Sequence, residues 1–454
     1  MRRRGGVRPS RQNWRTLLIR AVGFFPAAAL FFLCLLAVLF TAMPVLAGEG
    51  ELKLQSLIGE ALKSNPEIHV SEAKTTAAEH RIPQVKSLAD PMVMLGYENE
   101  GTDSLYTFNK DTKGMPAASR WMLSYSQMLP YPGKRALKGE MATQDAESLK
   151  ALVGSVKLNT IARVKELYYD LSLAYTTIGL LRDKTALFAR TEDAALARYA
   201  SGMGPQQEVL MAQTEKYMLL EREEMEKQKI KSLEAMLSAA LGRDGSLPPG
   251  ARPEKLFYIP YITGVDELIK NAQDNNPLIK SREKIAAGAA AKVQMAKKEF
   301  YPDFTLGGTY FAKPPQYPDM WNITATVNIP LYYKHKQEQG VLEAESLLLE
   351  TKKDVEATKL MVSSSLRDNH SMVKTAEALM ALYKDGLIPK AYQDFELSLA
   401  GYTTGKVEAI TVITRLKALI DYELLYQGQF VQREKGIARL EAIAGNVDYE
   451  TGAK

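Results

Sequence analysis

The sequence has 454 residues, one cysteine and a formal net charge of +5. All of the excess positive charge comes from seven arginines within residues 1–47, and without them the remaining chain carries a net charge of −2. This balance excludes the basic surface that a nucleic-acid-binding protein needs, so we expect no nucleic-acid partner. The single cysteine, Cys34, leaves residues 48–454 without disulfides or thiol-bound metals.

Residues 1–47 have the pattern of a secretory signal peptide. The arginines precede an apolar run that begins at Val22, and Val45 and Ala47 supply the small residues that a signal peptidase needs, which predicts cleavage after Ala47. The apolar run is also long enough to span a bilayer, so an uncleaved anchor is the alternative. Lipidation of Cys34 is less favoured, because bulky phenylalanine and leucine residues precede it where a lipoprotein peptidase requires small ones.

The rest of the sequence contains one unit twice. Residues 57–68 recur as residues 268–279, 211 positions later, and each copy contains an Asn-Pro step. Tyr199-x-x-Gly202 recurs as Tyr402-x-x-Gly405, 203 positions later. The predicted organisation is a signal peptide at 1–47, a first repeat at 48–250, a linker at 251–262, a second repeat at 263–445 and a C-terminal tail at 446–454.

Each repeat predicts the same order of elements. A short helix precedes the Asn-Pro step, a second helix follows it, and a β-hairpin comes next, at about 91–129 in the first repeat and about 302–329 in the second. From Gly133 to Ala200 there is no proline, and apolar residues recur every three or four positions. Such a helix would be on the order of 100 Å long, which excludes an ordinary globular domain. A plain coiled coil has the same helical pattern.

The predicted strands argue against a coiled coil alone. Residues 321–329 alternate strictly between apolar and uncharged polar side chains, as in a strand with one face in lipid and the other towards a wet lumen. The predicted lumen residues are Ser124, Ser126, Asn322, Thr324, Thr326 and Asn328. Four strands cannot close a barrel and open edges are not tolerated in lipid, so several chains would have to share one barrel.

Three duplicated or ordered motifs carry a family resemblance: the Ala-x3-Asn-Pro openings, the Leu-Pro-Tyr-Pro-Gly-Lys-Arg segment at 129–135, and the two Tyr-x-x-Gly breaks. Across residues 52–445 the sequence resembles the TolC-like outer-membrane efflux proteins. The resemblance implies a mainly α fold with a small β part, in which three copies form a twelve-stranded membrane barrel above a long α-helical barrel that crosses the periplasm. The Pro-Gly-Lys-Arg stretch is most similar to the branch that serves heavy-metal and drug pumps of the resistance-nodulation-division type.

The same resemblance implies the partners and the location. Cargo would pass from an inner-membrane pump, of the resistance-nodulation-division or ABC type, through a periplasmic adaptor and into a homotrimer embedded in outer-membrane lipid. Two alternatives remain open at this point: an exit duct for type I protein secretion, and a periplasmic coiled-coil adaptor or scaffold.

The resemblance also places the periplasmic tips at the two helix breaks. The residues implied in adaptor contact are Tyr199, Gly202, Gly204, Tyr402, Gly405 and Lys406. Some relatives close this end with rings of aspartates, whereas the matching positions here are Thr411 and Thr414. Glu208 occupies the first-repeat equivalent of Thr411, so three copies would place a ring of carboxylates at the narrow end. Such a ring would select cations or hold the closed state through contacts with Lys406; a solvated helix charge is the alternative.

No motif in the sequence predicts an enzyme, a cofactor or a resident metal. The four histidines, at positions 69, 80, 335 and 370, lack the spacing of metal ligands. Several methionines surround the first hairpin, namely Met92, Met94, Met122 and Met128. A soft-metal relay for copper or silver would use such residues, but the sequence favours ordinary apolar filler.

Overall fold

The computed structural model describes residues 51–98, 120–245, 247, 250–313 and 317–445. The signal peptide predicted at 1–47, its cleavage after Ala47 and the tail predicted at 446–454 lie outside the described residues.

Apart from the two-residue strands β1 and β4, the elements occur in the same order twice, as the duplicated motifs lead us to expect. The first half contains β1 (Glu51–Leu52), α2 (Leu54–Ser64), α3 (Pro66–Lys86), β2 (Met92–Glu98), β3 (Arg120–Leu129), α4 (Lys134–Ala200), α5 (Gln206–Leu241) and β4 (Arg252–Pro253). The second half contains α6 (Val265–Asn275), α7 (Pro277–Lys298), β5 (Asp303–Ala312), β6 (Met320–Asn328), α8 (Gln337–Ala381), the π-helical η1 (Leu382–Leu387), α9 (Ile388–Thr403) and α10 (Ala409–Ala444). The run α8–η1–α9 therefore corresponds to α4.

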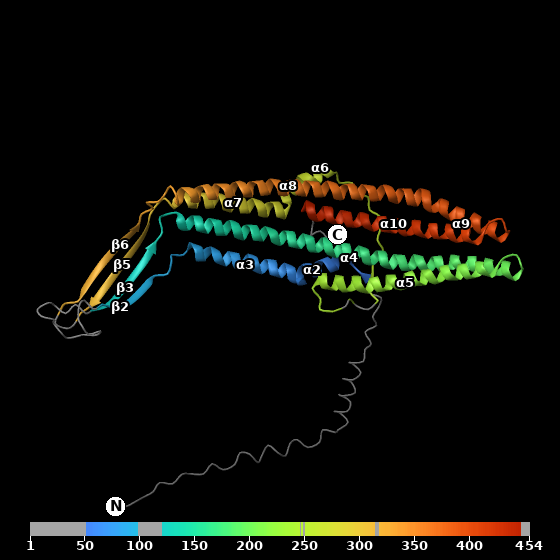
Figure 1. Cartoon of the computed structure of the whole chain (residues 1–454), viewed down its shortest axis with the longest axis horizontal. Coiled ribbons are helices and arrows are strands. Elements are labelled where there is room, and N and C mark those ends of the chain that lie inside the picture. The colour runs from blue at the N-terminus through green and yellow to red at the C-terminus, as the bar shows by residue number, and fades with distance from the viewer. Residues whose placement is uncertain (1–50, 99–119, 246, 248–249, 314–316, 446–454) are drawn as a thin grey trace, which may run out of the picture. The chain divides into compact units, whose positions relative to one another are not determined.

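The 67-residue helix α4 is the central element of the helical layer. It packs against α3 and α5 of its own repeat and against α7 and α10 of the other repeat (Figure 1). Helix α8 packs against α7 and α10 in the same way. The described residues form three hydrophobic clusters. The buried stripe of α4 contributes to two of them, with Leu171 in one and Leu181 and Phe188 in the other. Packing of these apolar stripes, rather than helix propensity, stabilises helices of this length.

The duplicated Asn-Pro step joins three helices in each repeat. The Asn65 side chain caps α3 by accepting a hydrogen bond from the Glu67 amide, and its Nδ2 donates to the Ala240 carbonyl at the end of α5, at 2.8 Å. Asn276 repeats both bonds in the second half, with the Leu278 amide and the Ile443 carbonyl. An asparagine is therefore needed because one side chain must accept at a helix start and donate at a helix end.

The four longer strands form one antiparallel sheet in the order β2-β3-β5-β6. The register places Ser124 opposite Thr309, and their hydroxyl oxygens lie 2.8 Å apart. Because side chains alternate between faces, this register puts all six predicted lumen residues on one face, which we call the polar face. Its opposite, the apolar face, carries residues such as Leu123, Tyr310 and Ile323. Within the described residues, β2 and β6 each have one unpaired edge.

The predicted linker at 251–262 is held more firmly than its sequence suggests. Its residues Arg252 and Pro253 form β4, which pairs in parallel with β1. Arg433 of α10 is fully buried, and its Nη2 donates to the Ile259 carbonyl at 2.5 Å while its Nε donates to Glu377 of α8 at 2.9 Å. Two-residue strands and a single buried arginine leave no periodic signal in the sequence, so neither was predicted.

The helical run of the second repeat contains a widened turn close to Pro389, where a proline is expected to bend a helix. The π-helical segment Leu382–Leu387 immediately precedes Pro389, which lies in the first turn of α9, where its missing amide hydrogen is tolerated. Of the described helices, none combines the length and hydropathy required to cross a bilayer.

Gly242→Ala is expected to lower the free energy of unfolding by about 2 kcal/mol or more. Gly242 has a φ of 77°, and an added Cβ would lie 2.2 Å from the Ser64 carbonyl oxygen. Gly179→Ala is the matched control, because nothing lies within 4 Å of a Cβ there and alanine is the better helix former. Thermal unfolding of both variants measures the difference, and equal melting temperatures would contradict the close packing inferred for Gly242.

Candidate functional site: the helical tips and the polar face

Both predicted tips are sharp turns of the same type. Just after the end of α4, Gly202 has a φ of 74°, and the Met203 amide donates back to the Arg198 carbonyl at 2.8 Å. Just after the end of α9, Gly405 has a φ of 77°, and the Lys406 amide donates to the Gly401 carbonyl in the equivalent bond. These are Schellman caps, in which a left-handed residue satisfies the last helical carbonyls. The glycines are thus required by the backbone, whatever the tips contact.

Arg198 ties the two tips together. One guanidinium nitrogen donates to the Tyr402 carbonyl and another to the Met203 carbonyl, each at 2.9 Å. The guanidinium also lies 4.9 Å from the centre of the Tyr402 ring, close enough for a cation–π contact. The Tyr402 hydroxyl donates to Glu208 at 2.7 Å. We call Arg198, Tyr402 and Glu208 the tip cluster.

The tip cluster is closed to solvent. Tyr402 is fully buried, and Arg198 and Glu208 keep only 15% and 19% of their side chains exposed. Burial, together with the hydrogen bond to Glu208, raises the pKa of the Tyr402 phenol, so it remains a protonated donor throughout the physiological range.

The tip cluster has no counterpart in the other half of the repeat. Tyr199, the equivalent of Tyr402, is 46% exposed. The positions 203 residues after Arg198 and Glu208 hold Gly401 and Thr411. Comparison of the two repeats in the sequence therefore identified Tyr402 and Glu208 but missed Arg198. The feature that could have indicated Arg198 is that the second break has a glycine, Gly401, at the equivalent position.

Three of the other predicted tip residues are accessible or partly so. Lys406 and Thr414 are exposed, and Thr411 is half-buried. A Cβ at Gly204 would lie 3.0 Å from a Glu208 carboxylate oxygen, so the lack of a side chain there leaves room for the cluster.

The expected pairing of Glu208 with Lys406 is not found within the described part of the chain. Glu208 instead accepts from Tyr402 and lies 4.0 Å from the Arg198 guanidinium. The reason is geometric: the Lys406 backbone closes the α9 cap, while the buried Tyr402 hydroxyl needs an acceptor and Glu208 supplies it.

Charged clusters mark the two ends of the sheet. Arg120 donates to Glu98 at 2.7 Å on the polar face at one end. At the other end Lys134, only 3% exposed, donates to Asp303 at 2.9 Å and to the Tyr301 carbonyl at 3.1 Å. The lysine of the Pro-Gly-Lys-Arg stretch therefore fixes the junction between the strands and the helices, since a buried lysine needs such partners.

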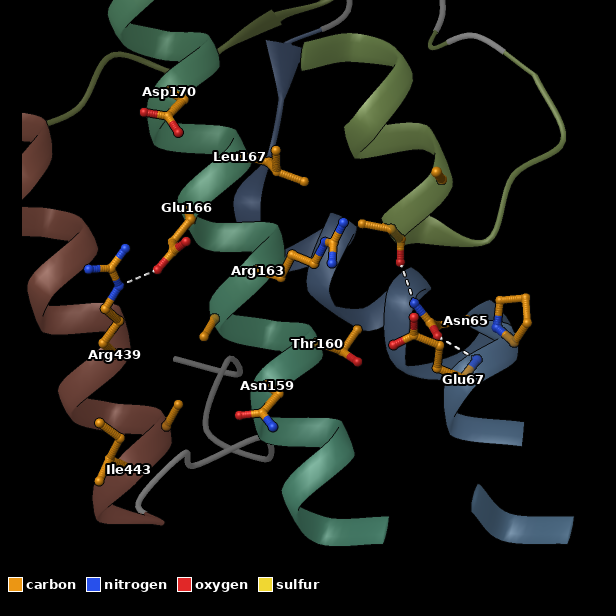
Figure 2. A pocket seen from close by; sticks show the side chains of 15 residues that line it. Asn65, Glu67, Asn159, Thr160, Arg163, Glu166, Leu167, Asp170, Arg439 and Ile443 are labelled. Carbon is orange, nitrogen blue, oxygen red and sulfur yellow. Dashed lines mark hydrogen bonds and ion pairs between the residues drawn. The ribbon is translucent and has the colours of Figure 1, made fainter. Parts of the chain in front are cut away.

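A cavity of about 890 Å³ lies over the middle of α4, between the Asn65 junction and α10 (Figure 2). Part of its polar lining makes internal bonds, such as the Arg439 guanidinium donating to Glu166 at 2.5 Å (Figure 2). Similar ion pairs continue along the interface between α4 and α10: Lys165–Glu441, Asp170–Lys435 and Lys184–Glu423. The cavity is therefore part of the contact between the repeats.

The fold defines a two-repeat chain of long antiparallel helices with a strand sheet at the junctions α3–β2, β3–α4, α7–β5 and β6–α8. Within the described ranges, no group of three or more His, Cys, Asp or Glu side chains gathers as metal ligands would.

Comparison with known proteins finds a matching family model, a relative and solved structures with this architecture. Residues 57–243 match the family model of the outer membrane efflux proteins. The cobalt-zinc-cadmium resistance protein CzcC of Cupriavidus metallidurans is 21% identical over 397 residues, which cover 87% of this chain and 90% of that protein. The solved structure of CusC has a TM-score of 0.74 at 14% identity and covers 87% of this chain and 93% of its own. The outer membrane protein VceC of Vibrio cholerae has a TM-score of 0.72 at 18% identity, with 87% and 96% covered.

The chain is therefore a homologue of the outer-membrane efflux proteins and has their fold. This confirms the resemblance drawn from its duplicated motifs.

Tyr402→Phe is expected to destabilise the tips by about 1 kcal/mol, because it removes the hydrogen bond to a largely buried carboxylate. Amide hydrogen exchange in residues 198–208 and 400–407 should become faster. Tyr199→Phe is the matched control from the other repeat and should change exchange little, since its side chain is exposed. The tip cluster would be refuted if both variants exchanged alike.

Proposed function

We propose that the chain is one subunit of a passive outer-membrane conduit, in which three copies close into a ring. The ring would receive cargo from an inner-membrane pump through a periplasmic adaptor. One observation carries the proposal. The strands and helices at each free edge of the chain correspond, in the other repeat, to strands and helices that already pack together inside the chain.

The sheet supplies the first pair of edges. Inside the chain, β3 of the first repeat pairs with β5 of the second. The equivalents of these strands are β6 and β2, which are the two strands with an unpaired edge. The repeat therefore predicts that β6 of one copy pairs with β2 of the next. Three copies would then give twelve strands with every backbone group paired, as a membrane-spanning sheet requires.

The helical layer supplies the second pair. Helix α4 contacts α7 and α10 across the boundary between repeats. Its equivalent is the run α8–η1–α9, and the equivalents of α7 and α10 are α3 and α5. Helix α8 of one copy would accordingly pack against α3 and α5 of the next copy. The same rotation that relates the repeats would then generate the ring.

The tips and the similar proteins support the rest of the proposal. The capped turns at Gly202 and Gly405 present exposed side chains, including Tyr199 and Lys406, for adaptor contact. The likeness to a cobalt-zinc-cadmium resistance protein favours metal ions over polypeptides as cargo. The subunit itself would carry out no reaction, and the pump would supply the energy.

The double variant Val327→Cys/Leu95→Cys is expected to form a covalent trimer on oxidation. Gln127 lies opposite Leu306 inside the chain, and their repeat equivalents are Val327 and Leu95. Directly opposite residues of an antiparallel pair have Cα atoms about 4.5–5.5 Å apart, which lies within the roughly 4.4–6.8 Å that a disulfide spans. Cys34 belongs to the predicted leader, so the mature chain contributes no competing thiol.

The pair Val327→Cys/Met94→Cys is the control, because Met94 lies on the polar face and Val327 on the apolar face. Non-reducing gels of purified outer membranes give the readout. Planar bilayers containing the cross-linked trimer should show discrete conductance steps. Monomer alone in the Val327/Leu95 variant would overturn the proposed ring.

A further inference from the structure

The methionines of the sheet are segregated to one face. The register places all five methionines of the four described strands on the polar face: Met92, Met94, Met122, Met128 and Met320. The apolar face is built mainly from leucine, valine, isoleucine and aromatic residues, with no methionine among its described positions. This distribution favours a ligand role over apolar filler, because apolar side chains are expected on the face that meets lipid.

Four of these side chains are exposed, and the fifth, Met122, is half-buried. Met92 and Met94 are 68% and 52% exposed, and Met128 is 43% exposed. Their neighbours on the polar face include serine, threonine and asparagine, so the thioethers project from a hydrogen-bonding wall. Leaving large apolar side chains in water forfeits their burial free energy, so packing within the chain gives no reason for methionine at positions 92, 94 and 128. Met122 differs, because it lies opposite Phe311 on the neighbouring strand.

Four of the five methionines are neighbours on adjacent strands. Met94 lies opposite Ser124, and Met122 is two positions away on the same strand and face; Met92 lies opposite Ser126, and Met128 is again two positions away. Diagonal neighbours have Cβ atoms roughly 7–8 Å apart, within reach of long side chains. Gly96 leaves room for Met122 to lie over β2, because a Cβ there would be 2.9 Å from the Met122 methyl carbon.

We infer that the thioethers of Met92, Met94, Met122 and Met128 bind soft monovalent metal cations, Cu(I) or Ag(I), on the polar face. Thioether sulfur is a soft, uncharged donor that selects Cu(I)-type ions over zinc or cobalt. An uncharged donor set holds an ion weakly enough to release it, which suits a wall along which cargo moves. The inference rests on the proposed function in taking this face as the lumen, and it narrows the metal cargo to soft ions.

The test uses the full-length mature protein in detergent, with silver nitrate in chloride-free buffer as the probe. Isothermal titration of the quadruple Met→Leu variant at positions 92, 94, 122 and 128 should show silver affinity lowered by about tenfold or more, since leucine offers no lone pair. The control replaces four exposed methionines outside the sheet by leucine: Met203, Met218, Met225 and Met236. The control should bind as the unmodified protein does.

Two further readouts distinguish thioether ligands from imidazole or carboxylate ligands. Silver binding should be the same at pH 5.5 and pH 7.5, because a thioether does not titrate, and an excess of zinc should not displace silver. An unchanged affinity in the sheet variant would overturn the inference, as would an equal loss in the control. Leucine preserves the apolar surface, so a face that binds apolar organic cargo would give that unchanged result.

Failure of this inference is distinguishable from failure of the proposed conduit. A trimer that conducts ions but does not bind silver would remove the metal site and keep the conduit. A chain that forms no trimer would remove the conduit, whatever its silver affinity.

Discussion

The structure depends on the contact between its two repeats. Across that boundary β3 pairs with β5 in the sheet, and α4 packs against α7 and α10 in the helical layer. Ion pairs between side chains reinforce both levels: Lys134 binds Asp303 at the strand–helix junction, and Lys435 binds Asp170 along the helices. A single chain makes this contact once and leaves its equivalent unmade at each edge. Unpaired strand edges are not stable in lipid, and the proposed ring would pair the edges that a single chain leaves open.

The repeats are not equivalent everywhere, and the differences fall where function is expected. At the tips, Arg198 joins Tyr402 and Glu208 into one buried cluster, while the other repeat offers Gly401 and Thr411. Each chain therefore has one locked connection between its two tips.

Much of the fold follows from the sequence because its signals are periodic or duplicated. The helix 134–200 was predicted from an uninterrupted three- and four-residue apolar spacing, and the polar face from strict alternation at 321–329. The Asn-Pro steps were recognisable as a repeat, but their role was not. Only the structure reveals that Asn65 reaches Ala240, 175 residues away. Arg198 and Arg433 were missed for a related reason, since a single long-range contact leaves no local pattern. The methionine segregation was missed because the strand register, which assigns each residue to a face, depends on the pairing partner.

The native mass of the protein, extracted from outer membranes in mild detergent, tests the central claim most directly. The account predicts a mass of three mature chains, with every sheet and helix edge paired to a neighbouring copy. A monomer or dimer recovered from the periplasmic fraction would contradict it, because the free edges of β2 and β6 would then have no partner in the membrane.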